Sequence, residues 1–136
     1  MPGRWTHWAA SAAALAQQGR LTAQSAAQAE ALLHFGRLIG NSDMHAGNLS
    51  LRVDPVNLAR PRFTLAPVYD MLPMRWRPDP QQGGAPDYSP FEPDPVALAG
   101  PARAVAAVFW ARLADCAAVC IGLRQTADAM ARRLVS

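Results

Sequence analysis

The chain has 136 residues, which is enough for one domain with a core of its own. Hydrophobic residues make up 51% of it and charged residues 17%, a composition that excludes an intrinsically disordered protein. The formal charge is +3, and all 13 basic residues are arginines. This excess of positive charge is too small and too scattered along the sequence to predict nucleic-acid binding by itself.

Two helices are predicted at the start of the chain. Residues 5–17 favour a helix that ends before Gly19, and Thr22 is a typical N-cap for a second helix over residues 23–39. The first helix lacks the long apolar core of a signal peptide, and no apolar run reaches the length of a membrane span, so we expect no membrane attachment.

A short antiparallel hairpin is predicted next. Residues 49–53 alternate apolar and polar side chains, residues 63–65 do the same, and Asp54 begins the loop between them. One hairpin among several helices predicts an α+β fold that is mainly α-helical.

The segment 73–95 is loop-like, because it contains seven prolines and almost no periodicity. It forms most of a loop-rich stretch over residues 73–100, and we expect residues 75–77 to lie in a solvated part of it. A stretch of this length without regular structure is expected to be poorly ordered and the most protease-sensitive part of the chain.

Two further helices are predicted over residues 101–122 and 125–134. Cys116 and Cys120 would lie one turn apart on the first of these helices, a spacing that rarely permits a disulfide. We expect both to be small buried apolar side chains in a reduced, cytoplasmic protein.

Three polar residues flank the predicted hairpin. Asp43 and Asn48 precede its first strand and Asp70 follows its second strand, so an antiparallel hairpin should return Asp70 to the neighbourhood of Asn48. Phosphoryl transfer from ATP needs a carboxylate to accept the hydroxyl proton and oxygen ligands for magnesium. Protein kinases present these groups in the same order along the chain. Each residue taken alone could equally be an ordinary turn residue.

Two segments carry a more specific resemblance. Residues 39–50, IGNSDMHAGNLS, and residues 65–73, LAPVYDMLP, resemble the catalytic loop and the metal-binding segment of the HipA-like serine/threonine kinase family, with greatest similarity to its YjjJ-type branch. Residues 4–7, RWTH, and the C-terminal helices extend the resemblance over most of the chain. It implies that residues 1–136 are a protein-kinase-like C-terminal lobe from a toxin–antitoxin-type kinase.

The resemblance also implies roles for individual residues. Asp43 would be the catalytic base, Asn48 and Asp70 would bind magnesium, and Tyr69 together with Asp70 would contact ATP weakly. Supporting roles in the catalytic loop would fall to Asn41, His45 and Gly47.

The resemblance further implies ATP and Mg²⁺ as ligands, and a protein substrate or an antitoxin-like protein as partner. Direct binding to nucleic acid is not expected. For Gly47, we expect the glycine to supply a backbone conformation that other residues avoid.

The sequence departs from the family pattern in one large respect. HipA-like kinases have an N-terminal lobe with a phosphate-covering loop and an ATP-anchoring lysine. This sequence has no lysine and no glycine-rich strand–turn–strand, and only 42 residues precede Asp43. Arginine does not replace such a lysine, because its geometry and hydration differ. We therefore expect the chain to be inactive alone and to need a separate N-terminal lobe.

Two other functions fit parts of the sequence. A small-molecule kinase of the aminoglycoside-phosphotransferase type shares the Asp-x-His-x-x-Asn pattern of residues 43–48, although the segment 65–70 argues against it. A non-catalytic truncated remnant, acting at most as a partner-binding module, would fit the missing lobe.

Overall fold

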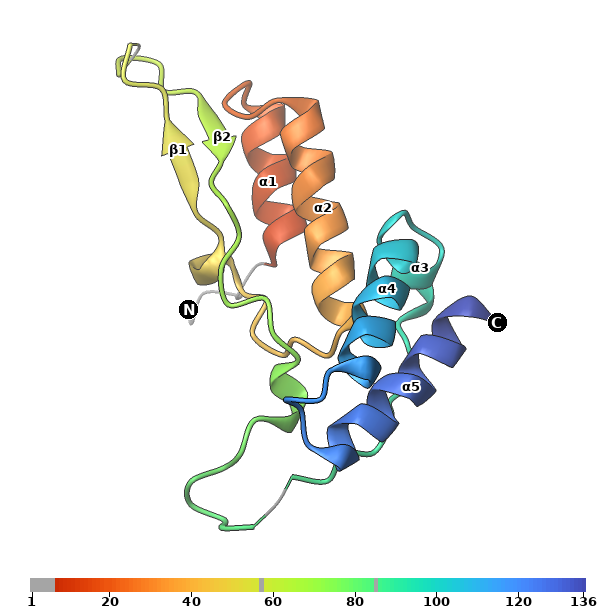
Figure 1. Cartoon of the computed structure of the whole chain (residues 1–136). Helices are drawn as coiled ribbons and strands as arrows, with labels where there is room; N and C mark the ends of the chain where they lie inside the picture. Colours follow the sequence, from red (N-terminus) through yellow and green to blue (C-terminus); the bar gives the residue numbers. More distant parts are fainter. Residues whose placement is uncertain (1–6, 57, 85) are drawn as a thin grey trace. The chain divides into compact units, whose positions relative to one another are not determined.

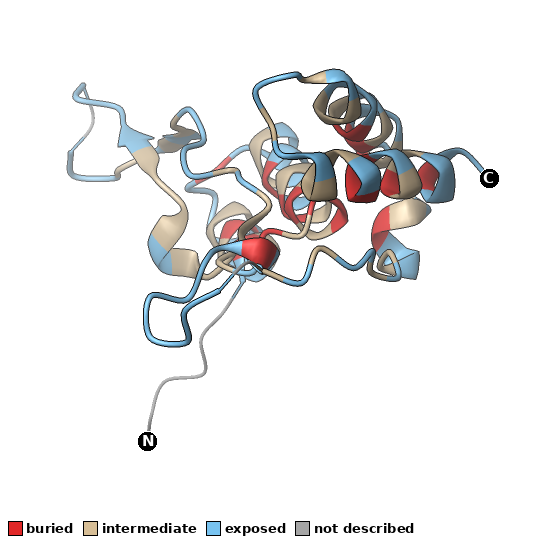
Figure 2. Ribbon diagram, turned by 60° about the horizontal axis from the view of Figure 1, so that its bottom comes forward, coloured by how far each residue is buried: buried red, intermediate tan, exposed pale blue. Residues whose placement is uncertain are grey.

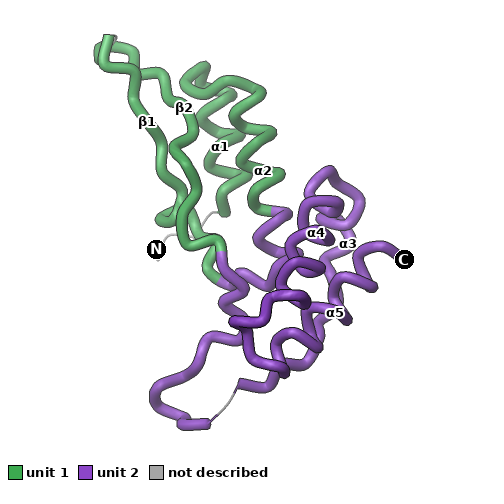
Figure 3. Tube along the Cα trace, viewed as in Figure 1, with its two compact units in different colours: residues 1–33, 43–71 green, residues 34–42, 72–136 purple. Residues whose placement is uncertain are grey.

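The computed structural model describes residues 7–56, 58–84 and 86–136, so Trp5 of the first predicted helix lies outside the described residues. The described chain contains five α-helices and one two-stranded antiparallel sheet (Figure 1), which confirms the prediction of a mainly helical fold with one hairpin. It divides into two compact units (Figure 3): residues 1–33 with 43–71 form unit 1, and residues 34–42 with 72–136 form unit 2.

Unit 1 contains α1 (Trp8–Gln17) and most of α2 (Ala23–Leu38). The predicted cap of α2 is confirmed, because the Thr22 hydroxyl accepts a hydrogen bond from the backbone N–H of Ser25 at 3.1 Å. Ala12, Leu21 and Ala29 form one buried cluster between the two helices. The small alanine side chains allow the helix backbones to approach closely.

The hairpin of unit 1 pairs β1 (Leu51–Val53) with β2 (Phe63–Leu65). The first strand is shorter than the predicted range of residues 49–53. Leu51 lies opposite Leu65, and both pack with Phe63 against the helical cluster, while Arg52 and Thr64 face solvent. The backbone N–H of Phe63 also donates to the carbonyl of Arg20 at 2.7 Å, which joins the hairpin to the turn between α1 and α2.

Unit 2 is built around α4 (Ala102–Asp115) and α5 (Ile121–Val135), with the single-turn helix α3 (Pro95–Leu98) before them. Its core contains the fully buried side chains of Trp110, Met130 and Leu134, which line the inner faces of the helices (Figure 2). The indole Nε1 of Trp110 donates to the carbonyl of Leu38 at 2.9 Å, so this buried polar atom is satisfied.

The end of α2 follows the pattern of a glycine-terminated helix. The backbone N–H of Asn41 donates to Gly36 at 2.8 Å, that of Gly40 donates to Arg37 at 3.3 Å, and Gly40 has a φ of +77°. These are the two bonds and the left-handed residue of a Schellman motif, which stops the helix where the turn cluster of the sequence predicts.

The prediction of one helix over residues 101–122 is wrong. Cys116 is the C-cap of α4 and Cys120 is the N-cap of α5, so the two thiols lie in a turn, half-buried and exposed respectively. No glycine or proline marks this break. It is stabilised instead by Arg124, whose Nε donates at 2.9 Å to the carbonyl of Ala114 in the last turn of α4.

The loop-rich segment is anchored more firmly than its composition suggests. Trp76 lies in the short 3₁₀-helix η2 (Met74–Trp76) and is only 6% exposed, so the expectation of a solvated loop is wrong at this residue. Its ring lies 5.8 Å from those of both Phe91 and Trp110. The continuously exposed part of the segment is shorter than residues 73–95. We expect protease cleavage to fall within residues 79–84, which are all exposed.

Candidate active site

Asp43 and Asn48 lie in one loop of unit 1, between α2 and β1. The loop contains one turn of 3₁₀-helix, η1 (Ala46–Asn48). The side-chain Nδ2 of Asn48 donates to the backbone carbonyl of Asp43 at 2.9 Å. This bond closes the loop, and it leaves the amide oxygen of Asn48 as an available acceptor.

His45 links the two ends of this loop. Its Nδ1 accepts a hydrogen bond from the backbone N–H of Gly47 at 3.0 Å, and its Nε2 lies 3.0 Å from Oδ1 of Asp43. Since Nδ1 accepts, the neutral ring carries its proton on Nε2 and donates it to the Asp43 carboxylate. His45 therefore orients the carboxylate, and its supporting role in catalysis stays a prediction.

Gly47 is required for a different reason than the sequence suggests. Its φ is not positive, so the expectation of an unusual backbone conformation is wrong. A Cβ atom at this position would instead lie 2.8 Å from Cε1 and 2.9 Å from Nδ1 of His45, well inside van der Waals contact. The glycine leaves room for the imidazole that holds Asp43.

Trp8 anchors the same loop from α1, a role that the sequence does not indicate. Its side chain is 1% exposed, and its Nε1 donates to the backbone carbonyl of His45 at 2.9 Å. His7, the N-cap of α1, also forms an isolated antiparallel bridge with His45. The sequence offers one general hint of this role: a buried tryptophan needs a hydrogen-bond acceptor for its N–H.

Asp70 lies after β2, in the same unit as Asp43 and Asn48. It is the one non-glycine residue with positive φ, +53°, among the described positions. Aspartate tolerates this left-handed conformation better than most residues, but it still costs free energy and often marks a functional site.

The hairpin brings Tyr69 to the chain just before β1, and the approach of Asp70 to Asn48 stays a prediction. The backbone N–H of Ala66 donates to the backbone carbonyl of Ser50 at 3.0 Å. This bond extends the hydrogen-bond ladder of the hairpin by one pair beyond β1 and β2. The hydroxyl of Ser50 lies 3.1 Å from that of Tyr69, so this tyrosine reaches the residue that immediately precedes β1, two residues after Asn48. Asn41 belongs to unit 2. It is buried in the turn that ends α2.

The donor set fits magnesium in its chemistry. It consists of the amide oxygen of Asn48 and the carboxylate of Asp70, and magnesium prefers such hard oxygen ligands. In the part of the chain that the structure describes, no three His, Cys, Asp or Glu side chains come close enough to hold a metal ion. No helix in the described ranges is long and apolar enough to cross a membrane.

Comparison with known proteins defines the family. The model of the HipA-like C-terminal domain matches residues 5–136, so the chain belongs to this family, as its two motifs predict. It is also similar to toxin YjjJ of Escherichia coli (strain K12), with 51% identity over 78 residues, which are 57% of this chain and 16% of that protein. No solved structure matches the chain.

Proposed function

We propose that this chain provides the catalytic and metal-binding half of an ATP-dependent protein serine/threonine kinase of the toxin–antitoxin type. The observation that carries the proposal is the loop in which His45 orients the Asp43 carboxylate while Asn48 closes the loop on the Asp43 carbonyl. Family membership and the similarity to a toxin support it.

In this proposal, Asp43 accepts the proton of the acceptor hydroxyl as the oxygen attacks phosphorus. The Nε2–H of His45 fixes the orientation of the carboxylate that receives the proton. The side chain of Asp43 is 45% exposed, so a protein acceptor can reach it from solvent.

Asn48 and Asp70 would hold Mg²⁺, with Tyr69 beside the nucleotide. When bound, the metal neutralises charge on the transferring phosphoryl group. The left-handed backbone of Asp70 aims its carboxylate in a direction that an extended strand residue would not take. The bond between Ser50 and Tyr69 ties this segment to the strand that follows the catalytic loop.

Residues of this chain can serve as the metal ligands and the base, but the sequence has no lysine to anchor the phosphates. Catalysis of phosphoryl transfer consists mostly of positioning and electrostatic stabilisation, so the 136-residue chain alone should bind nucleotide feebly and transfer no phosphate. An additional lobe, covalently attached or added separately, would be needed. The partners are then a protein substrate and an antitoxin-like protein, in a reduced cytoplasmic setting that fits the two free thiols.

The test is a transfer assay with labelled ATP, Mg²⁺ and candidate protein acceptors. We expect no transfer by the chain alone, and Mg²⁺-dependent nucleotide binding once a HipA-like small lobe is supplied. Asp70→Asn should abolish that binding, whereas Asp54→Asn, the same change at an exposed aspartate of unit 1, should leave it unchanged.

Three results would contradict the proposal in different ways. Transfer by the chain alone that disappears in Asp43→Asn would show that no further lobe is needed and would support the assignment of the base. Transfer that persists in Asp43→Asn would overturn the base assignment as well. Binding of a partner protein without any nucleotide binding in the presence of a small lobe would favour the partner-binding module instead.

A further inference from the structure

A hollow lined by arginine lies at one end of unit 1. It has a volume of about 550 Å³ and forms between the α1–α2 turn and the segment that leads into β2, which are joined by the bond from Phe63 to Arg20. We call it the arginine hollow. Its lining contains no carboxylate and consists of Gln18, Gly19, Arg20, Ala59, Arg60, Pro61 and Arg62.

The net charge of the chain is concentrated at this end. The α1–α2 turn and the hairpin carry four arginines and one aspartate, an excess of +3 that equals the formal charge of the whole chain. The remaining nine arginines are balanced by nine acidic residues. Three of these four arginines, at positions 20, 60 and 62, line the hollow, and the fourth is Arg52 of β1.

Two arginines of the hollow, Arg20 and Arg62, differ from several arginines of unit 2. Arg132 and Arg133 pair with Asp128 and Glu92 at 2.7 and 2.8 Å. The side chains of Arg20 and Arg62 have no ion pair or hydrogen bond to any described residue. Their contacts come from the backbone: the carbonyls of Arg20 and Arg62 accept from Phe63 and Asp54, and the N–H of Arg20 donates to the carbonyl of Leu15. The two guanidinium groups add no described contact to the fold.

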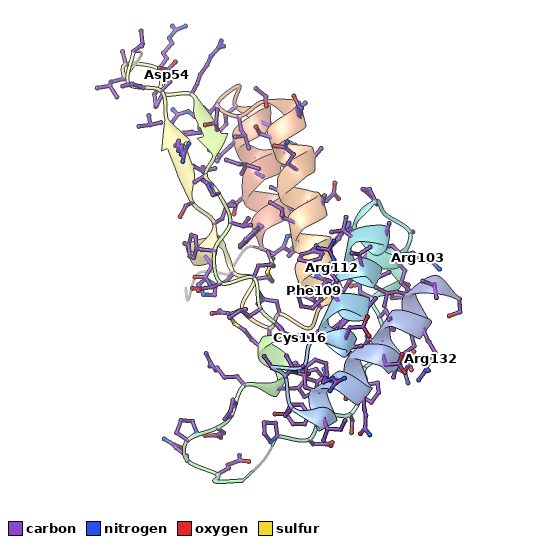
Figure 4. All side chains as sticks on the ribbon, in the orientation of Figure 1. Asp54, Arg103, Phe109, Arg112, Cys116 and Arg132 are labelled. Atoms are coloured by element: carbon purple, nitrogen blue, oxygen red, sulfur yellow. The ribbon has the colours of Figure 1, made fainter. Side chains whose placement is uncertain are left out.

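Apolar side chains project beside the hollow. Val56 is 90% exposed and Leu58 is 70% exposed, in the loop at the tip of the hairpin that Asp54 begins (Figure 4). Exposed aliphatic side chains in the same loop as arginine are typical of protein-binding surfaces, where arginine is enriched.

We propose that the arginine hollow and the hairpin tip bind an acidic polypeptide segment. Aspartate or glutamate side chains of the partner would enter the hollow and pair with the guanidinium groups, for which a planar carboxylate is the matching acceptor. Apolar side chains of the same segment would cover Val56 and Leu58. This site is separate from the residues of the proposed kinase function and does not depend on it.

Two other anionic partners fit these observations less well. Nucleic acid would leave Val56 and Leu58 uncovered, and the hairpin loop has no aromatic side chain on which a base could stack. A lipid bilayer is broad and flat and would not enter a concave hollow between a helix turn and a strand. The concave shape admits single side chains of a polypeptide.

The first test uses the whole chain and a short fluorescent peptide of glutamate and leucine, with binding followed by anisotropy. We expect saturable binding that weakens as salt is added, and at least ~10-fold weaker binding of a peptide in which glutamine replaces glutamate. Equal binding of the two peptides would overturn the proposal. So would tighter binding of duplex DNA or of phosphatidylserine vesicles than of the acidic peptide.

The second test places the binding on named residues. Arg20→Gln with Arg62→Gln should weaken peptide binding by roughly 10-fold or more, because two charge-assisted contacts are lost. Arg77→Gln with Arg112→Gln removes the same charge from exposed arginines of unit 2 and should change it less than about twofold.

Circular dichroism would show that both double variants keep the fold. Val56→Ser with Leu58→Ser should weaken binding by about 10-fold, through loss of apolar contact. Equal effects of the two arginine pairs would place the binding outside the hollow and contradict the proposal.

Discussion

The two units of this chain are stabilised by different means. Unit 2 has an aromatic core in which the rings of Trp76 and Phe109 lie 5.8 and 5.2 Å from that of the fully buried Trp110. Unit 1 has a buried cluster of small and medium aliphatic side chains and one buried ring, that of Trp8, and its loop between α2 and β1 is held by single hydrogen bonds that involve His45 and Asn48.

This difference separates stability from the candidate chemistry. Large buried rings resist local opening, whereas a half-exposed loop held by a few polar contacts can admit ligands. Asp43 and His45 are 45% and 38% exposed at their side chains, and Asp70 keeps a strained backbone. We therefore expect substitutions in unit 2 to act on folding, and substitutions in unit 1 to act on the site.

The largest effect is expected in the core of unit 2. Trp110→Ala removes the ring contacts and the bond to Leu38, and it should lower the free energy of unfolding by about 3–5 kcal/mol. Leu21→Ala in unit 1 should cost only about 2 kcal/mol, because its neighbours in the buried cluster are alanines. Urea unfolding followed by circular dichroism would measure both, and equal costs would contradict the comparison.

A smaller effect is expected when the space beside His45 is filled. Gly47→Ala places a methyl group against the imidazole and should destabilise the chain by about 1–3 kcal/mol, or move the ring away from Asp43. NMR shifts of the His45 ring would report the displacement. Gly100→Ala is the matched control, since its Cβ would meet only an ordinary contact at 3.4 Å, and it should leave stability and the His45 signals almost unchanged.

The pH dependence of stability should include a contribution from Asp94 of unit 2. Hydrogen bonds from the backbone N–H groups of Ala97 and Val96, together with Arg37, hold the pKa of Asp94 below its usual value. A lowered folded-state pKa contributes stability that is present above the unfolded pKa of about 3.9 and is lost as the pH falls through the folded pKa.

Two variants at this position separate capping from titration. Asp94→Asn keeps a capping oxygen for α3 but cannot titrate, so the loss of stability below pH ~4 should become shallower. Asp94→Ala should also remove about 1 kcal/mol at neutral pH. Thermal unfolding across this pH range would measure the slopes, and an unchanged slope in Asp94→Asn would exclude the contribution.

The smallest effect is expected at Asp70, where the sign matters more than the size. Its φ of +53° costs a side chain free energy that glycine avoids. Asp70→Gly should therefore be about 1 kcal/mol more stable than Asp70→Ala. Asp87 has no positive φ and serves as the control, so the Asp87→Ala variant should be at least as stable as the Asp87→Gly variant. The same order at both positions would show that the backbone of Asp70 is not strained.

The sequence alone predicted the local elements whose signals are strong. Thr22 marked the start of α2, Gly40 marked its end, and alternating side chains marked the hairpin; each is a short-range effect of backbone hydrogen bonding. The two motifs around Asp43 and Asp70 together also predicted the family. Patterns of this kind depend on neighbouring residues, which the sequence displays directly.

Only the tertiary structure determined the break at residues 116–120, the burial of Trp76 and the reason for Gly47. Each depends on a contact between residues that periodicity does not connect, or on the position of a side chain in three dimensions. Arg124 caps the end of α4, aromatic rings 15 and 34 residues away surround Trp76, and the ring of His45 occupies the space that Gly47 leaves. The gathering of scattered arginines into one hollow has the same cause, because folding joins the α1–α2 turn to the hairpin through a backbone bond.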